Sequence, residues 1–320
     1  MRRGRSAWPG YLLRRAYGAV LVLALLVVLT FLLVRLVPGD PARVMLGIDA
    51  TPEQVAQVHS ALGLDRPLPA QFVDYVRGLF TGDFGTSFRT SRPVSETISQ
   101  RLPVTAALAA AALGVVLVIG FPAGILVGFA ESRGKARAVS KSFTSLTSFI
   151  SGVPEYVMGT ALVVVFALKL GVLPAQGGGD LRGYVLPALA VGLGASAVFA
   201  RLVRNETVST LEQEYILTAL SKRISTWRLL TRHVLPNVVT STLSLAGLML
   251  VGIVGGTVIT ENVFNIPGLG SEVVNAVTTN DYPTVQGILL VLGTLAVLVN
   301  LTVDVILGLI DPRVLTEGRR

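Results

Sequence analysis

The sequence predicts an all-α polytopic membrane protein with six transmembrane helices, and three observations support this fold class. Of the 320 residues, 52% are hydrophobic and only 14% are charged, which is too apolar for an ordinary soluble domain. The apolar residues gather in runs of about 20 residues or more, the length of a helix that crosses a bilayer. The alternating pattern of a membrane β-barrel is missing, so each run should be helical.

Six spans fit the hydropathy of the chain. They lie at residues 17–37, 104–129, 142–169, 184–203, 238–260 and 285–310. Arginines precede the first span as in a signal peptide, but no small-residue cleavage site follows it, so we expect it to remain in the protein. Small residues are frequent in the second and fifth spans, where they favour close helix packing over a pore lining.

The distribution of charge predicts the orientation of the spans. Five arginines precede the first span, and the segments 130–141 and 201–237 are rich in Lys and Arg, whereas the 261–284 segment has three acidic residues and no Lys or Arg. Basic residues accumulate on the cytoplasmic side, so both termini are expected in the cytoplasm of a bacterial or archaeal cell. The net charge of +8 follows from this pattern, and no basic patch is interleaved with aromatics as in a nucleic-acid-binding protein.

The long segment 38–103 is expected to be extracytoplasmic and helical. Thr51 is a suitable N-cap before Pro52 at a first helical position. A second, amphipathic helix should end at Gly82, and a third should run from Pro93 to Arg101. A role in substrate contact and a role in packing and assembly both remain open for this segment.

The predicted organisation has four parts. They are the cytoplasmic N-terminus with the first helix (1–37), the extracytoplasmic segment (38–103), a five-helix core (104–310) that includes a cytoplasmic loop at 205–237, and a cytoplasmic tail (311–320).

The sequence contains few of the residues and motifs that are typical of an enzyme active site. It has no cysteine and two histidines, which the predicted topology places on opposite sides of the membrane. The HExxH, GxSxG and phosphate-binding Gly-Lys-Ser/Thr patterns are all missing from the sequence. We therefore expect no catalytic residues, no metal site and no cofactor in this chain.

Two acidic residues inside the predicted spans are candidates for function, because a charge in hydrocarbon normally faces a partner or a wet cavity. Glu155 follows Pro154, which should kink the third span. A place on a translocation path and a role as a satisfied structural carboxylate both remain open for Glu155. Asp304 in the sixth span is expected to pair with Arg201 or Arg204.

The loop 205–237 is the longest polar interval on the basic side of the chain. A helix is expected from Glu206 to Lys222, and a second short helix from Ser225 to His233. Such a hairpin either lies on the membrane surface or fits a groove in a soluble partner.

The centre of the first of these helices favours the protein groove. A surface-bound helix should show a continuous bulky apolar face, whereas Glu214, Thr218 and Ala219 occupy its middle. Pro236 should either end the second helix or mark the point where the chain enters the fifth span.

This loop resembles the EAA coupling segment of ABC importer permeases. Glu214 to Ala219 (EYILTA) matches the start of that motif, and Arg232 to Asn237 (RHVLPN) matches its end. Further motifs in the same order resemble the dipeptide/oligopeptide/nickel permease family, and especially its B-type subunit, over nearly the whole chain: VPGDPA, LGLDRPL, GDFGTSF, RLPVTAALA, ENVFNIPGLG, DYPTVQG and DVILGLIDPRV.

The resemblance implies a type I ABC importer permease fold and a non-catalytic membrane subunit. Such a chain would form half of a translocation pathway for peptides or related solutes such as glutathione-like compounds and nickel complexes. It would work with a second permease, an extracytoplasmic binding protein and two ATPase subunits that hold ATP and Mg. The implied coupling residues are Glu214, Tyr215, Thr218, Ala219, Lys222, Arg223, Arg232 and Pro236.

One residue departs from the family pattern. Arg223 stands where the family usually has a glycine between the two short helices. Arginine does not readily take a positive φ, so the turn must be made differently or at a cost on the order of 1 kcal/mol.

Two other classes of protein fit the sequence less well. A self-sufficient secondary transporter or channel would favour inverted repeats and buried ionisable chains, and the sequence has no visible repeat. An intramembrane enzyme would need a nucleophile–base pair at membrane depth, and the sequence offers none.

Overall fold

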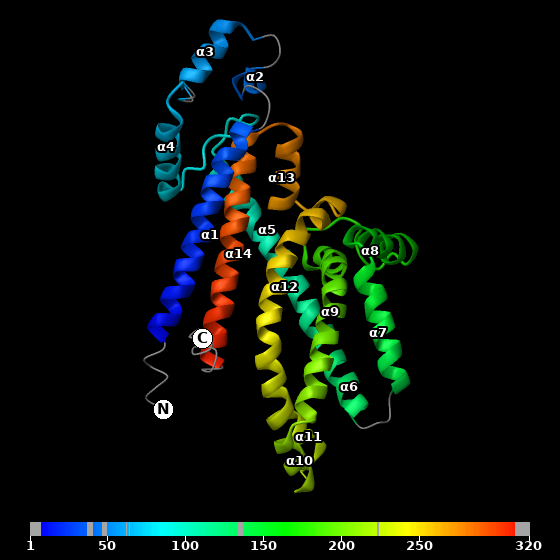
Figure 1. Ribbon diagram of the computed structural model, residues 1–320. Coiled ribbons are helices and arrows are strands. Elements are labelled where there is room, and N and C mark those ends of the chain that lie inside the picture. The colour runs from blue at the N-terminus through cyan, green and yellow to red at the C-terminus, as the bar shows by residue number, and fades with distance from the viewer. Residues whose placement is uncertain are drawn as a thin grey trace. The chain divides into compact units, whose positions relative to one another are not determined.

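The computed structural model describes residues 8–310 except 37–40, 47–49, 62, 64, 133–136 and 223, and these described residues form helices and loops without a strand (Figure 1). The α-helices are α1 (Trp8–Leu36), α2 (Pro41–Leu46), α3 (Pro52–Ala61), α4 (Leu68–Thr81), α5 (Val94–Val115), α6 (Phe121–Ser132), α7 (Arg137–Gly152), α8 (Glu155–Leu162), α9 (Val185–Leu211), α10 (Glu214–Ser221), α11 (Thr226–Leu229), α12 (Leu235–Val263), α13 (Leu269–Thr278) and α14 (Tyr282–Ile310). Segments Val116–Gly120, Val163–Lys169 and Leu230–Val234 are π-helical, and Leu181–Tyr184 is a 3₁₀ turn.

The predicted all-α, six-span architecture is confirmed. Five helical stretches are long and apolar enough to cross a membrane, and the bent pair α7–α8 makes a sixth if it is counted as one span. The five stretches are Trp8–Leu33, Val94–Ser132, Leu181–Leu211, Leu245–Val263 and Tyr282–Ile310.

The second stretch starts earlier than the sequence suggested. A separate helix from Pro93 to Arg101 was wrong, because α5 runs without a break from Val94 through Pro103 into the membrane-spanning part. A proline removes one backbone donor, and membrane helices tolerate this loss when neighbouring groups satisfy the freed carbonyl.

The chain divides into two compact units. The first comprises Met1–Ala16, Ala106–Ile266 and Leu298–Arg320, and the second comprises Tyr17–Thr105 and Pro267–Val297. Each unit is described by itself below.

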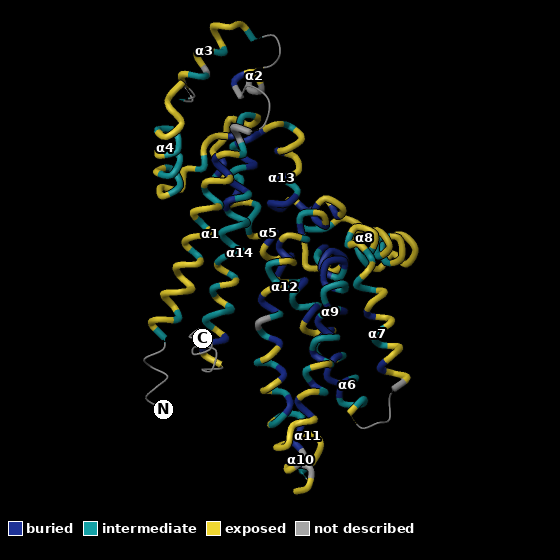
Figure 2. The backbone as a smooth tube through the Cα atoms, in the orientation of Figure 1, coloured by how far each residue is buried: buried dark blue, intermediate teal, exposed yellow. Residues whose placement is uncertain are grey.

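In the first unit, α9 is the central helix. It contacts α6, α7, α8 and α12 (Figure 1). Along its length 14 of its 27 residues are buried, including Ala190, Phe199 and Val203, and this burial is visible in Figure 2. The helix is therefore surrounded by protein rather than by lipid.

Glycines set the distance between α6 and α9. A Cβ added to Gly120, Gly124 or Gly128 would lie 2.9, 2.6 or 2.8 Å from the carbonyl oxygens of Ser196, Ala200 and Arg204, respectively. Successive glycines are four residues apart, and so are the residues they meet on α9. The two helices therefore run parallel to each other. Small residues permit this close approach of backbones in a membrane, where lipid gives no hydrophobic drive for association.

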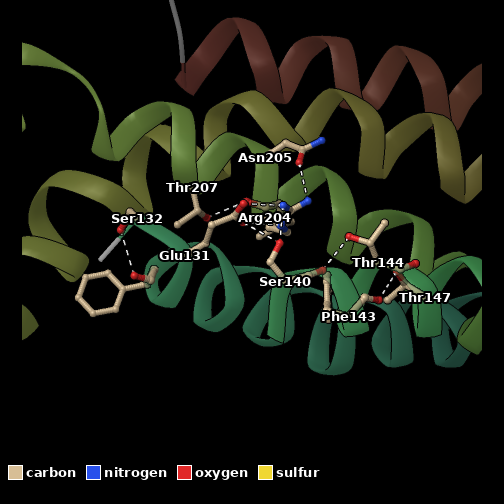
Figure 3. Close-up of polar contacts among 11 residues, drawn as sticks. Glu131, Ser132, Ser140, Phe143, Thr144, Thr147, Arg204, Asn205 and Thr207 are labelled. Carbon is tan, nitrogen blue, oxygen red and sulfur yellow. Dashed lines mark hydrogen bonds and ion pairs between the residues drawn. The ribbon is translucent and has the colours of Figure 1, made fainter. Parts of the chain in front are cut away.

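An ion-pair cluster joins α6, α7 and α9 next to this contact (Figure 3). Arg204 donates from Nε to Glu131 Oε2 (2.7 Å) and from an Nη atom to Glu131 Oε1 (2.8 Å). It also donates to the Ser140 hydroxyl at 2.6 Å, and that hydroxyl donates to Glu131 at 3.1 Å. The side chains of Arg204 and Glu131 are 18% and 30% exposed, so the pair is largely withdrawn from solvent.

The expected pairing of Asp304 with Arg201 or Arg204 was wrong. The Asp304 carboxylate lies 3.0 Å from the guanidinium of Arg15 on α1. Arg204 is already engaged by Glu131, and Arg201 donates to the Ser151 hydroxyl at 3.3 Å. Partners were assigned from the predicted side of the membrane alone, and this does not tell which helices pack together.

Pro154 breaks the third predicted span more sharply than a kink. Helices α7 and α8 meet at an angle of 96°, with Gly152 and Val153 at the break. Proline lacks the backbone N–H and clashes with the preceding turn, and the residue before it is restricted to extended backbone. Two short helices therefore replace the single helix expected over 142–169.

In the second unit, polar contacts hold the 82–93 turn to the start of α14. The buried Asp281 carboxylate accepts hydrogen bonds from the Ser87 hydroxyl (2.6 Å), the Phe88 N–H (2.9 Å) and the Thr284 hydroxyl (2.8 Å). A salt bridge of 2.7 Å between Arg101 and Glu272 adds a link from α5 to α13.

Two helices of segment 38–103 agree with the prediction, α3 at its start and α4 at its end. Thr51 accepts from the Gln54 N–H while Gln54 Oε1 accepts from the Thr51 N–H, a reciprocal cap at the start of α3. Helix α4 ends at Gly82, whose φ of 76° only glycine adopts readily. The ring of Phe72 on α4 lies 5.1 Å from that of Phe31 on α1.

We predict that Gly124→Ala destabilises the protein by about 1–3 kcal/mol, because the new methyl group would overlap Ala200 O and Val203. The matched control is Gly114→Ala on α5, where an added Cβ meets no atom within 4 Å. Melting temperatures of the two variants in the same detergent test this difference. Equal melting temperatures would contradict the proposed α6–α9 constraint.

A second prediction concerns the cluster of Figure 3. Arg204→Gln should lower the stability by about 1–3 kcal/mol, because it leaves the Glu131 carboxylate without its charged donors. Adding Glu131→Gln should restore part of this loss, since no unpaired charge remains. A double-mutant cycle on melting temperature measures the coupling, and strictly additive effects would argue against it.

Candidate functional site

The segment 205–237 contains two structural parts rather than one helical hairpin. Helix α9 continues to Leu211, so Glu206, Thr207 and Thr210 belong to this long helix, and Thr207 and Thr210 are buried. The expected helix from Glu206 to Lys222 was therefore wrong in its first half. The hairpin proper is α10 followed by α11, and both lie together at the end of α9 and α12 (Figure 1).

Helix α10 has an inner and an outer face. Ile216 and Ala219 are buried, at 0% and 7% exposure, and the helix contacts α9 and α11. The predicted coupling residues Glu214, Tyr215, Thr218 and Lys222 are exposed. Ala219 is thus part of the packing inside the hairpin, whereas the other four form its accessible face.

The second half of the hairpin runs directly into α12. Leu229 and Val234 are buried, and the π-helical turn after α11 continues into α12. Pro236 lies in the first turn of α12 and does not stop a helix, because a proline there needs no intrahelical donor. Arg232 and Pro236 are exposed.

A side-chain contact ties the two halves together. The amide of Asn237 donates to the Tyr215 hydroxyl (3.0 Å) and to the His233 carbonyl (2.7 Å). This places the EYILTA and RHVLPN motifs against each other. Arg223, the residue that departs from the family glycine, lies outside the described residues.

Trp227 is a surface feature that the sequence reasoning passed over. Its side chain, on α11, is 77% exposed. A large aromatic ring left in solvent is typical of a contact surface. The signal in the sequence was a tryptophan within a short polar helix.

Glu155 and Pro154 lie at the bend between α7 and α8. Pro154 is the N-cap of α8 and Glu155 is its first residue. The Glu155 carboxylate lies against Gly256 of α12, since a Cβ built there would be 2.8 Å from both carboxylate oxygens. Within the described residues no ion pair or hydrogen bond holds this carboxylate.

Within the described part of the chain, no group of three or more His, Asp or Glu side chains is placed to hold a metal ion. The candidate site therefore consists of the exposed face of α10 and α11 and, separately, one partly buried carboxylate in a span.

Comparison with known proteins agrees with this geometry. Residues 120–316 match the family model described as binding-protein-dependent transport system inner membrane component, and residues 10–109 match the model of the N-terminal part of such components. A putative peptide transport system permease protein of Brucella abortus (strain 2308) is 36% identical over 311 residues, covering 95% of this chain and 98% of that protein. The glutathione transport system permease protein of Salmonella typhimurium (strain LT2) is 35% identical over 306 residues, with the same coverage.

Two solved structures share the fold. Both are inward-facing conformations of the MetNI methionine ABC transporter, with TM-scores of 0.56 and 0.59 at 17% and 16% identity. Each alignment covers 67% of this chain and 96% of the other. The chain thus has the type I ABC importer permease fold and is a multi-pass inner-membrane protein. It belongs to the family of binding-protein-dependent transport system inner membrane components, the permeases of ABC importers.

Proposed function

We propose that this permease forms half of the translocation pathway for peptides or closely related small solutes such as glutathione. The names of the Brucella and Salmonella relatives support this substrate class. The single observation that carries the coupling part of the proposal is the α10–α11 hairpin, whose exposed polar face lies at the end of the central helix α9.

We infer the partners from the family to which the chain belongs. Two ATPase subunits would bind ATP and Mg, and α10 would fit into a groove on an ATPase. A second permease would complete the pathway. An extracytoplasmic binding protein would deliver the solute. The sequence contains no phosphate-binding Gly-Lys-Ser/Thr loop, which is consistent with ATP hydrolysis in separate subunits.

The coupling mechanism is a rigid displacement. When the ATPase pair closes on ATP, it would shift α10, which contacts α9 directly. Because α9 is held to α6 by the glycine contacts and to α7 by the hydrogen bond from Arg204 to Ser140, these helices would move together. The two ligands, ATP and the loaded binding protein, would each bias the same two-state element.

Co-purification distinguishes this function from a self-sufficient transporter or channel. The chain expressed with its gene neighbours should be isolated with two ATPase subunits and a second permease, and the complex in liposomes should import peptide only with ATP and binding protein. ATP-independent uptake by the isolated chain would refute the proposal.

We predict that Glu214→Lys leaves the complex assembled but reduces ATP-driven peptide uptake by about tenfold or more. Glu214 is exposed at the start of α10, so the reversed charge disturbs docking rather than folding. The measurement is peptide uptake together with the stimulation of ATPase activity by loaded binding protein.

The matched control is Glu212→Lys, an exposed residue between α9 and α10, which should behave like the wild type. Ala219→Asp should act differently, because it buries a charge inside the hairpin and lowers the yield of complex. Unchanged coupling in Glu214→Lys would place the docking surface elsewhere.

The proposed orientation has both termini and the hairpin in the cytoplasm. The chain has no cysteine, so single cysteines can report on sidedness. Arg92→Cys should react with a membrane-impermeant maleimide from outside the inner membrane, and Glu212→Cys only after the membrane is opened. Both residues are exposed. Reaction of Glu212→Cys from outside would reverse the assignment.

A further inference from the structure

Glu155 is a carboxylate inside a membrane span for which the described residues provide no cation. Arg201 on α9, a helix that contacts α7 and α8, donates to Ser151 on α7. A charged group in hydrocarbon is costly unless it faces a partner or water. Something outside the described contacts must therefore compensate this charge.

The surroundings of the carboxylate are defined by α8 and α12, which contact each other. Glu155 lies against Gly256, and Gly159, one turn further along α8, lies against Phe264, whose ring is 3.0 Å from an added Cβ. Gly256, Thr260 and Phe264 are four residues apart and share one face of α12. Thr260 therefore lies on the face of α12 that meets α8.

The Thr260 hydroxyl is itself unsatisfied. The residue is 1% exposed, and its Oγ1 has no hydrogen-bond partner within the described residues. Most buried hydroxyls are hydrogen-bonded, as neighbouring Thr257 is to the Val254 carbonyl at 2.8 Å. A carboxylate and a hydroxyl, both without a hydrogen-bond partner among the described residues, thus belong to the same helix–helix contact.

A simpler role for Glu155 is to stabilise the start of α8 through the helix dipole. That role predicts a carboxylate turned toward the first N–H groups of its own helix. The oxygens instead lie over Gly256, where the missing side chain makes room for them.

We propose that Glu155 and Thr260 form a site for the primary ammonium group of the transported solute. An ammonium group has three donors and one positive charge, so it satisfies a carboxylate and a hydroxyl at once. Gly256 keeps the space open for the carboxylate. The proposal rests on the proposed function, because it names the part of a peptide that the pathway recognises.

The test uses the whole importer in proteoliposomes with its own ATPases and binding protein. Its probes are trialanine and N-acetyl-trialanine, which differ in the amino terminus. The measured quantity is the ratio of their initial uptake rates at saturating binding protein. Every permease variant is measured with the same binding protein. Any preference of that protein for one of the two peptides therefore affects all ratios equally and cancels when the variants are compared.

Glu155→Gln should lower this ratio about tenfold relative to the wild type, and Thr260→Val about threefold, because each removes one acceptor. Gly256→Ala should also lower it, because the added methyl group displaces the carboxylate without removing its charge. Glu155→Asp should recover part of the preference. The control is Glu96→Gln, an exposed acid in the first turn of α5, which should leave the ratio unchanged.

An unchanged ratio in Glu155→Gln, with both peptides still imported, overturns the ammonium site and leaves the proposed function intact. Lower stability of Glu155→Gln at an unchanged ratio would instead support the helix-dipole role and also overturn the site. If the wild type imports neither peptide although loaded binding protein stimulates its ATPase, the peptide function itself fails and the inference fails with it. Should Glu155→Gln not assemble, Gly256→Ala and Thr260→Val decide the question by the same ratio.

Discussion

The close approach of α6 to α9 is the constraint on which the first unit depends. Three glycines four residues apart, Gly120, Gly124 and Gly128, bring one helix within van der Waals distance of the backbone of the other. Because the contact involves backbone atoms over two turns, it allows neither helix to slide or rotate independently. Lipid offers no hydrophobic drive for such pairing, so shape complementarity must supply it. The remaining contacts of α9, with α7, α8 and α12, are built around a pair whose relative position is already determined.

This rigidity bears on the proposed coupling, in which the short α10–α11 hairpin would act on a much larger membrane domain. Helix α9 is continuous from Val185 to Leu211 and is followed within a few residues by α10. A force on α10 is therefore applied at the end of the helix with the most neighbours. Close to that end, Arg204 pairs with Glu131 on α6 and donates a hydrogen bond to Ser140 on α7, so both helices are connected to α9. If the connection between the hairpin and the other helices were flexible, the same displacement of α10 would not move α9.

Sequence patterns predicted the parts of the fold that depend on local chemistry. Hydropathy located the spans, the cap at Thr51 marks the start of α3, and the left-handed Gly82 marks the end of α4, as expected. The patterns failed where partners are distant in the chain. Asp304 pairs with Arg15 rather than with a residue of span four, and the packing glycines of α6 were not singled out, because a glycine in a span looks the same whether it meets a helix or lipid. At the coupling site, residue types were predictable from the motif, but the inward position of Ala219 required the packing of the hairpin.

Three acidic residues of the spans, Glu131, Asp304 and Glu155, have different surroundings. Glu131 is compensated by Arg204 from a neighbouring helix, and Asp304 by Arg15 from the first helix. Both pairs connect helices that must stay together, so the charge serves assembly. Glu155 has neither arrangement among the described residues, and it lies at the 96° bend between α7 and α8. The face of α12 that it meets also carries Thr260, whose hydroxyl has no hydrogen-bond partner among the described residues. An acid that serves assembly has an arginine beside it, as Glu131 and Asp304 have, whereas the proposed ammonium site would give Glu155 a counter-charge only while a solute is bound.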